Sequence, residues 1–271
     1  MRNLIFITFD SLRWDTFCAA DAPFLKSLGS WKKAWTQATY TFPAHMSFFV
    51  GKLPQTFDDA PAYDCVAAKT RPQGGIPQRG RPWLRLENPE APRAADFVLR
   101  GKNLAEGFRN AGYATFCTGA VNWFNPTLPA GRYLTESFDE VAFFDGPDYA
   151  SHKSARKQLA WANERIAATT KPYFLFINFG ETHLRFAYEG CPWEHEKFNY
   201  GDATECKRRQ RACFEFLDTQ LRDFTYLHDA DLILCADHGE ALGEDGLWGH
   251  GFYHPSVMEV PMLLRAEGLT E

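Results

Sequence analysis

The residues of this sequence that could do chemistry stand directly after apolar runs. Asp237 and His238 follow the apolar run 232–236, and His250 and His254 come soon after them in a glycine-rich stretch. An apolar run that ends in polar residues is typical of a buried parallel strand, and ligands in open α/β sheets bind beyond the carboxyl ends of such strands. Asp237 and His238 could therefore hold a metal ion or a substrate. An Asp that caps a turn beside a surface His would give the same pattern.

Two further apolar runs end in residues of the same kinds. Asp10 follows the run 4–9, and Glu181 and His183 follow the run 173–179, which is the clearest strand pattern in the chain. Carboxylates and imidazoles gathered at one sheet edge form a ligand set for Zn²⁺ or Mn²⁺. Asp10 taken alone has a structural explanation as well, because Asp and Ser favour turns. The repetition of the pattern at several predicted strand ends favours the metal site.

Thr41 adds a hydroxyl to this set of ligands. Pro43 suits the first turn of a helix and Gly51 suits its C-terminal end, so Thr41 falls at or just before the N-cap. Capping alone would account for a Thr there, but a helix N-terminus also favours an anionic group. A Thr hydroxyl is a weak nucleophile at neutral pH, and a divalent cation on its oxygen would lower its pKa. Thr41 is therefore a candidate nucleophile.

Strand and helix patterns alternate along the chain. This alternation predicts an α/β fold, a three-layer sandwich whose mainly parallel central sheet is covered by helices on both faces. The length of 271 residues favours a single domain over residues 1–271, with two small domains as the alternative. The predicted strands cover residues 4–9, 113–117, 173–179, 232–236 and 260–263, and the predicted helices cover residues 23–35, 99–112, 154–168 and 205–227.

Residues 55–97 interrupt the alternation. Pro, Arg, Gly and Gln dominate residues 70–93, and the hydrophobic residues there follow no regular spacing of a helix or a strand. Because α/β patterns resume afterwards, we expect a lid-like excursion rather than a linker between domains. Its arginines could meet an anionic substrate, although solvated loop arginines are the default expectation. They are Arg71, Arg79, Arg81, Arg85 and Arg93.

The composition describes a globular protein with an aromatic core. Hydrophobic residues make up 45% of the chain and include 24 Phe and 8 Trp, which excludes a disordered chain. The net charge is −5, and no cluster of Lys and Arg resembles a nucleic-acid footprint. The most basic stretch, residues 207–211, lies in a helical pattern, and we interpret it as a solvated helix face rather than a polyanion site.

The cysteines and the N-terminus indicate the compartment. The seven cysteines are odd in number and form no CxxC pair, so we expect no disulfide framework and a reducing, cytoplasmic location. The apolar run after Met1 is too short for a signal peptide or a membrane span. We therefore expect no association with membranes.

Five short motifs, taken together, resemble the alkaline phosphatase/sulfatase superfamily, particularly its sulfatase-like hydrolase and phosphoethanolamine-transferase branches. They come in the order of that superfamily and span nearly the whole chain, and the expected last strand at residues 260–263 fits as well. Of these pieces, the segment from DHGE to GHG is the most specific for that superfamily. The motifs are FDSLRWD at 9–15, TFPAH at 41–45, ETH at 181–183, DHGE at 237–240 and GHG at 249–251.

The resemblance implies a role for each matched residue. Thr41 would attack phosphorus and form a covalent phosphoryl-Thr, while His183 and His250 would contact the transferred group or a second metal ion. Glu181 is a weaker candidate for that second ion, and the roles of His45 and His254 are left open. The metal ligands implied for one or two ions are Asp10, Thr41, Asp237, His238, His183 and His250.

Departures from the sulfatase pattern bear on the reaction and on the metal. Sulfatases carry a Cys or Ser that is oxidised to formylglycine, and a Thr at position 41 cannot yield that aldehyde. His45 stands where sulfatases have the motif Arg, Ser11 where many have a second Asp, and His250 near the position of a Lys. We therefore expect phosphorus chemistry, and Zn²⁺ or Mn²⁺ rather than Ca²⁺ or Mg²⁺. The chain ends soon after the last predicted strand, so no counterpart of the smaller C-terminal subdomain of sulfatases is expected.

These observations together predict a metal-dependent hydrolase that cleaves a small anionic substrate, a phosphate monoester or diester or a phosphonate, through phosphoryl-Thr41. A sulfatase or a phosphotransferase on the same scaffold is the first alternative. A catalytically silent relative that binds a metal ion is the second, and a tailoring enzyme of natural-product or phosphonate metabolism is the third.

Overall fold

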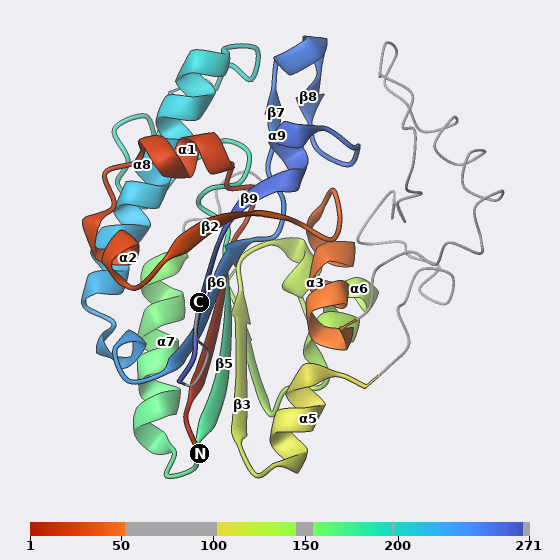
Figure 1. The fold of residues 1–271 in the computed structure, drawn as a ribbon, viewed down its shortest axis with the longest axis vertical. Helices are drawn as coiled ribbons and strands as arrows, with labels where there is room; N and C mark the ends of the chain where they lie inside the picture. The colour runs from red at the N-terminus through yellow and green to blue at the C-terminus, as the bar shows by residue number, and fades with distance from the viewer. Residues whose placement is uncertain (52–101, 145–153, 197, 268–271) are drawn as a thin grey trace, which may run out of the picture.

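The computed structural model describes residues 1–51, 102–144, 154–196 and 198–267, so the predicted excursion at 55–97 lies outside the described residues. A seven-stranded sheet in the order β2-β9-β6-β1-β5-β3-β4 forms the centre of this part of the chain (Figure 1). Its strands are β1 (Leu4–Phe9), β2 (Trp31–Trp35), β3 (Ala114–Gly119), β4 (Glu140–Phe143), β5 (Tyr173–Phe179), β6 (Asp231–Ala236) and β9 (Glu259–Arg265).

The sheet is parallel except at one strand. β1 pairs in parallel with β5 and β6, and β3 pairs in parallel with β4 and β5. β9 runs antiparallel to both β6 and β2. The register places Phe9 opposite Ala236 on one side and opposite Phe179 on the other. The three central strands therefore end at the same level, and the residues that follow them start side by side.

Helices cover both faces of the sheet, which confirms the predicted three-layer arrangement. α1, α2, α7 and α8 lie on one face, and α3, α5 and α6 lie on the other (Figure 1). None of the helices in the described ranges is long and apolar enough to span a bilayer. The helices are α1 (Trp14–Ala19), α2 (Pro23–Ser27), α3 (Thr41–Val50), α5 (Leu104–Asn110), α6 (Pro129–Thr135), α7 (Ala155–Ala168), α8 (Ala203–Arg222) and α9 (Pro255–Met258).

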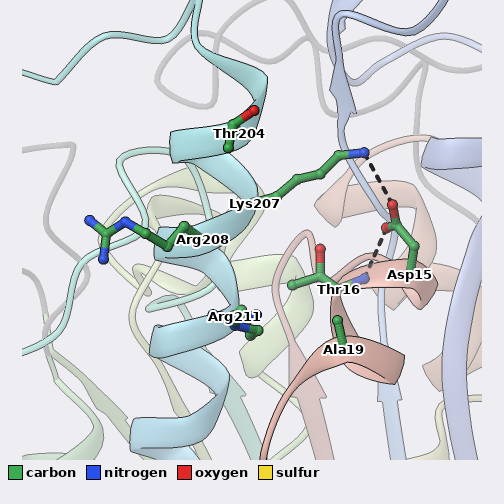
Figure 2. Close-up of a pocket in the computed structure, with 7 residues that line it drawn as sticks. All are labelled: Asp15, Thr16, Ala19, Thr204, Lys207, Arg208 and Arg211. Carbon is green, nitrogen blue, oxygen red and sulfur yellow. Dashed lines mark hydrogen bonds and ion pairs between the residues drawn. The ribbon is translucent and has the colours of Figure 1, made fainter.

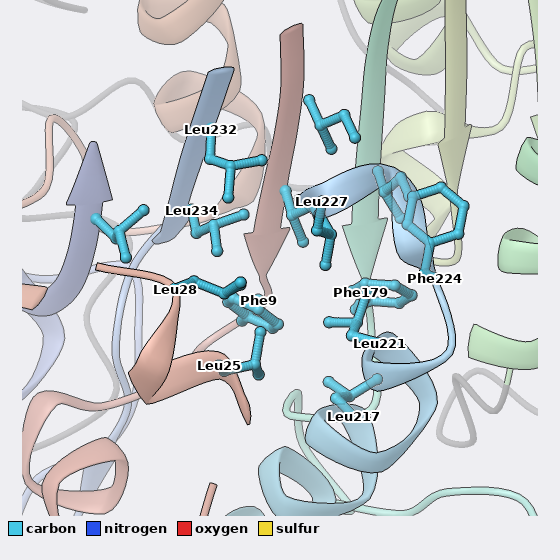
Figure 3. Packing of buried hydrophobic residues seen from close by; sticks show 14 of the residues in the cluster. Phe9, Leu25, Leu28, Phe179, Leu217, Leu221, Phe224, Leu227, Leu232 and Leu234 are labelled. Atoms are coloured by element: carbon cyan, nitrogen blue, oxygen red, sulfur yellow. The ribbon is translucent and has the colours of Figure 1, made fainter. Parts of the chain in front are cut away.

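Alternation along β1 divides the core into two clusters. Ile5, Ile7 and Phe9 belong to the cluster that contains Leu217 and Leu221 of α8. Figure 3 shows Phe9 beside these two leucines. Phe6 points to the other face and packs with aromatic residues of α3 and α6. Full burial of each Leu or Phe contributes about 1.5–3 kcal/mol, so the two clusters hold the ends of the central strands rigidly in place.

The predicted helix at residues 23–35 is wrong in its second half. α2 ends at Ser27, and Trp31–Trp35 form the edge strand β2, which pairs with β9. Gly29 and Ser30 interrupt the helical pattern, and the antiparallel partner that stabilises β2 comes more than 220 residues later in the chain. The predicted helix at 205–227 also ends early, because α8 stops at Arg222 and a 3₁₀ turn follows at Thr225–Leu227.

Candidate metal centre

Two carboxylates meet where β1 and β6 end. Asp10 follows β1 and Asp237 follows β6, and both side chains are completely buried. The backbone N–H of Ser11 donates to Asp237 Oδ1 at 3.1 Å, and the Ser11 hydroxyl donates to Asp10 Oδ1 at 3.1 Å. Ser11 adopts a left-handed backbone conformation, with φ of 61°, in making these contacts. The turn after β1 thus holds both carboxylates in one corner.

His238 completes this corner with an imidazole. Its Nδ1 lies 2.8 Å from the carbonyl oxygen of Gly239, so Nδ1 carries the proton and donates it to that carbonyl. The lone pair of Nε2 then faces Asp10 Oδ1 at 3.7 Å and Asp237 Oδ2 at 3.6 Å. One ligand atom from each of the three residues falls within 4.8 Å of the others. We call Asp10, Asp237 and His238 the metal corner.

The electrostatics of the metal corner suit a divalent cation. Burial, reinforced for Asp10 by the nearby Asp237, raises the pKa of each carboxyl to about 7. Burial also lowers the pKa of His238 to about 4, so its imidazole is neutral at pH 7. Asp237 Oδ2 is buried and accepts no hydrogen bond from the described residues. A divalent ion would use that oxygen and compensate the two carboxylates, as metal sites built from Asp and His do.

Thr41 lies at the edge of the metal corner. It is the first residue of α3, and its Oγ1 is 3.4 Å from both Asp10 Oδ2 and His238 Nε2. The side chain of the N-cap residue, Tyr40, makes no capping hydrogen bond at this end of α3. Gly51 ends the helix in a left-handed conformation, as the sequence predicted. The hydroxyl therefore sits at a helix N-terminus, where backbone N–H groups favour an anion.

His45 lies beneath Thr41 and is fully paired. Its Nδ1 donates to the Thr41 carbonyl oxygen at 2.7 Å, and its Nε2 accepts from the Thr8 hydroxyl at 3.0 Å. The Asn178 amide in turn donates to Thr8 Oγ1 at 3.0 Å. Burial lowers the pKa of His45 to about 3, so it is neutral over the ordinary pH range. The role that the sequence left open is structural: His45 ties the first turn of α3 to β1 and β5.

His250 adds a positive charge next to the metal corner. Its ring lies 4.4 Å from the ring of His238, centroid to centroid. Burial alone would lower the pKa of His250, but Glu240 Oε2 at 2.7 Å from Nδ1 outweighs this and raises the pKa to about 8. Glu240 is itself buried and accepts a hydrogen bond from the Tyr200 hydroxyl. His250 is therefore held as a cation at neutral pH.

Three further residues named in the sequence analysis are His183, Glu181 and His254. The His183 ring is 5.5 Å from the His250 ring, so it extends the row of imidazoles. Glu181 Oε1 accepts from the backbone N–H groups of Ser154 and Ala155 at the start of α7, while its Oε2 is buried and accepts no hydrogen bond from the described residues. His254 caps α9, since its Nδ1 accepts from the Ser256 backbone N–H. One oxygen of Glu181 and the imidazole of His254 thus serve helix ends.

Sequence reasoning missed two residues of the site. Glu240 belongs to the DHGE motif, yet only its contact with His250 shows what it does. The two residues flank the open end of a short hairpin formed by β7 (Ala241–Leu242) and β8 (Trp248–Gly249). Tyr200 lies 40 positions from Glu240, and no local pattern links the two. The acidic residue of the DHGE motif, two positions after the predicted ligand His238, was the one signal available for Glu240.

Arg13 joins the loop after β1 to the loop after β6. Its guanidinium donates to the Glu240 carbonyl oxygen at 2.6 Å and pairs with Glu244 at 2.7 Å. It also holds Asp15 through two bonds, at 2.7 and 2.8 Å. The two loops that supply the metal corner are therefore clamped together by a buried cation.

No protein-family model matches this sequence. Among curated proteins, the chain is 25% identical over 214 residues to the low-salt glycan biosynthesis sulfotransferase Agl7 of Haloferax volcanii. The match covers 63% of this chain and 53% of that protein, so the chain spans about half the length of this curated relative.

Solved structures share the fold at low sequence identity. The C-terminal periplasmic domain of EptC from Escherichia coli, in complex with Zn, matches 98% of this chain and 73% of its own, with 13% identity and a TM-score of 0.63. The match to the putative sulfatase yidJ from Bacteroides fragilis covers 97% of this chain and 68% of the sulfatase, with 16% identity and a TM-score of 0.61. The match to the phosphonate monoester hydrolase of Agrobacterium radiobacter covers 98% of this chain and 68% of the hydrolase, with 14% identity and a TM-score of 0.57. The chain thus shares its fold with these structures and with a protein in the alkaline phosphatase superfamily from Vibrio parahaemolyticus, which agrees with the resemblance at the level of the fold.

Proposed function

We propose that this chain is a metal-dependent hydrolase that cleaves a phosphate monoester, a phosphate diester or a phosphonate ester through a covalent phosphoryl-Thr41. One observation carries the proposal: the Thr41 hydroxyl lies 3.4 Å from Asp10 Oδ2 and 3.4 Å from His238 Nε2, at the uncapped N-terminus of α3. A hydroxyl in this position has a metal corner on one side and an anion-binding helix end on the other.

The proposed reaction uses the residues as follows. Thr41 Oγ1 gives its proton to Asp10 Oδ2, which lies 3.4 Å away, and attacks phosphorus. The bond from phosphorus to the leaving oxygen breaks, and the leaving group takes a proton. His250, whose pKa is raised to about 8, can supply that proton and attract the anionic group beforehand. Water then gives a proton to the neutral His250 and attacks the phosphoryl-Thr, and the Thr41 oxygen takes its proton back from Asp10. The released product is phosphate from a monoester, a phosphate monoester from a diester, or a phosphonate from a phosphonate ester. The backbone N–H groups at the start of α3 stabilise charge on the phosphoryl oxygens in both steps.

We propose that Asp10, Asp237 and His238 hold a divalent ion, with Thr41 as a further ligand. His183 and a neutral His250 would be the ligands for a second ion, and with that ion bound His250 would not be the proton donor. Bound there, a divalent ion would lower the pKa of the Thr41 hydroxyl and neutralise charge on the transferred group. Mixed carboxylate and imidazole donors suit Zn²⁺ or Mn²⁺ better than Ca²⁺ or Mg²⁺. The zinc complex of the EptC domain supports this choice.

Group transfer to an acceptor other than water is the second candidate. The match to a protein named as a sulfotransferase, and the fold shared with a domain of EptC, favour it. Paired assays with an aryl phosphate and an aryl sulfate, each with and without added alcohol acceptors, separate the candidates. Hydrolysis of the phosphate ester supports our proposal. Turnover of the sulfate ester alone, or turnover that requires an acceptor, contradicts it.

A silent metal-binding relative and the cytoplasmic location are tested separately. The silent relative would bind metal but fail to turn over any aryl ester, so metal analysis and the paired assays distinguish it from an enzyme. The proposed cytoplasmic location rests on the composition in cysteine and is checked by cell fractionation.

A further inference from the structure

Tyr200 lies outside the metal corner, yet one buried carboxylate joins its hydroxyl to the site. The hydroxyl donates to Glu240 Oε1, and the second oxygen of the same carboxylate, Oε2, lies 2.7 Å from His250 Nδ1. Burial and the nearby Glu240 raise the pKa of Tyr200, so its hydroxyl keeps the proton that it donates. Tyr200, Glu240 and His250 therefore form a line of hydrogen bonds that ends beside the metal corner.

The three residues of this line come from separate segments of the chain. Tyr200 belongs to the turn before α8, Glu240 follows β6, and His250 follows β8. Gly249 has a φ of 93°, a left-handed conformation, and a β-carbon there would lie 3.6 Å from the Tyr200 hydroxyl oxygen. The chain that carries His250 thus passes directly beside the Tyr200 hydroxyl, and the contact depends on the fold rather than on a local motif.

The surroundings of Tyr200 hold it in place. The first turns of α8, which follow Tyr200 in the chain, are bound to the loop after β1, because Lys207 contacts Asp15 at 3.2 Å (Figure 2). The Tyr200 ring packs against Trp248 of β8, with the ring centroids 5.3 Å apart. Tyr200 is therefore a fixed point from which the Glu240 carboxylate can be oriented.

The two contacts of Glu240 decide which nitrogen of His250 is left for chemistry. Nδ1 donates to Glu240, so Nε2 is the ring nitrogen that can meet the transferred group or a second ion. The His250 side chain is 25% exposed, and its ring centroid lies 4.4 Å from that of His238. A carboxylate held at one oxygen can still turn, and a hydrogen bond to its other oxygen restricts that motion. Tyr200 supplies this second bond.

We propose that Tyr200 is a positioning residue, which acts through Glu240 to fix the His250 ring with Nε2 toward the transferred group. Tyr200 itself touches neither the metal corner nor the transferred group. Its effect on turnover rests on the proposed function, whereas its effect on the orientation of the ring does not. The two effects are therefore measured separately.

The orientation is tested without turnover, in ¹H–¹⁵N NMR spectra of the histidine rings of the zinc-loaded protein. We expect a His250 Nδ1–H signal that exchanges slowly with water and is assigned by its loss in His250→Gln. Tyr200→Phe keeps the ring and removes only the hydroxyl. In this variant the signal should shift and exchange about tenfold faster, because Glu240 has lost one of its two hydrogen bonds.

Tyr113→Phe is the matched control for this variant. Tyr113 is also half-buried, and its hydroxyl donates to the Arg2 carbonyl oxygen at 3.1 Å. It directly precedes β3, at the amino end of that strand, whereas the metal corner lies at the carboxyl ends of β1 and β6. Tyr113→Phe should leave the His250 signal unchanged.

Turnover tests whether the orientation matters for the reaction. Tyr200→Phe should lower kcat for phenyl phosphate by about tenfold and change KM by less than about twofold. The fall in kcat should be smaller with p-nitrophenyl phosphate, because its leaving group needs less help from a proton donor. A general structural defect would lower kcat equally for the two esters.

Three results overturn the proposal: no slowly exchanging His250 signal in the wild type, an unchanged signal in Tyr200→Phe, or equal falls in kcat with both esters. If the wild type turns over neither ester, the proposed function fails. The ring signals then decide the role of Tyr200 by themselves.

Discussion

Two buried polar networks lie next to each other at the carboxyl ends of β1, β5 and β6, and they differ in how far the protein pairs their atoms. In the first, both ring nitrogens of His45 have partners, the Thr41 carbonyl and the Thr8 hydroxyl, and Asn178 donates to Thr8, although Asn178 Oδ1 accepts no hydrogen bond from the described residues. In the second, the metal corner, two buried carboxylates meet a neutral imidazole and Asp237 Oδ2 accepts no hydrogen bond from the described residues.

The pairing of both His45 nitrogens separates this residue from the ligand-binding residues of the metal corner. A paired buried network stabilises and orients the backbone, whereas unpaired buried acceptors destabilise a protein unless a ligand satisfies them. His45 Nδ1 lies only 3.8 Å from Asp237 Oδ2, so the two networks almost touch. Proximity to the site therefore does not assign a role to His45, but the pairing of its nitrogens does.

The largest effect is expected when the metal corner itself is removed. The double variant Asp237→Asn with His238→Ala takes away one charge and one imidazole, and we expect metal affinity to fall by more than about 10²-fold and turnover to be lost. Elemental analysis of the purified protein measures this. Unchanged metal stoichiometry in the double variant would mean that the ion, if any, binds elsewhere.

Loss of the nucleophile alone should separate turnover from metal binding. In Thr41→Ala we expect kcat to fall by roughly 10⁴-fold or more, because no other hydroxyl contacts both Asp10 and His238 in the described part of the chain. Metal content should stay near the wild-type value, since the three residues of the metal corner remain. Thr41→Ser is the matched control and should keep measurable activity.

Metal affinity should depend on pH in one direction. The pKa of Asp10 and that of Asp237 are raised to about 7, so protons compete with the ion below that pH. We expect affinity to fall about tenfold or more per unit below pH 7 and to level off above about pH 8. In the metal-free protein the same raised pKa values make the fold less stable as pH rises from about 4 toward 7. Titrations at several pH values, with thermal unfolding, check both trends, and a pH-independent affinity would contradict them.

The smallest effect on chemistry is expected in the paired network. His45→Leu removes two buried hydrogen bonds at similar volume, and we expect the free energy of unfolding to fall by about 1–3 kcal/mol. Metal content per folded molecule should stay unchanged, and kcat should fall far less than in Thr41→Ala. A loss of metal in His45→Leu equal to that in the double variant would erase the distinction between the two networks.

The sequence predicted the sheet edge well because strand ends are local. Asp10, Asp237 and His238 each follow an apolar run, and the parallel register brings them to one level. β2 was mistaken for helix because its strand partner β9 is distant in the chain. Glu240 and Tyr200 were missed for the same reason, since their contact forms only after folding. Glu181 and His254 were ambiguous because helix capping uses the same residue types as metal binding.

The most direct test of the account is to map the covalent intermediate. The metal-loaded protein is mixed with an aryl phosphate, quenched in acid and digested, and the peptide that contains Thr41 is sequenced by mass spectrometry. We predict a phosphoryl group on Thr41 in the wild type, and no phosphoryl group on that peptide in Thr41→Ala. Turnover of the ester with an unmodified Thr41, or a phosphoryl group on another residue, would contradict the account.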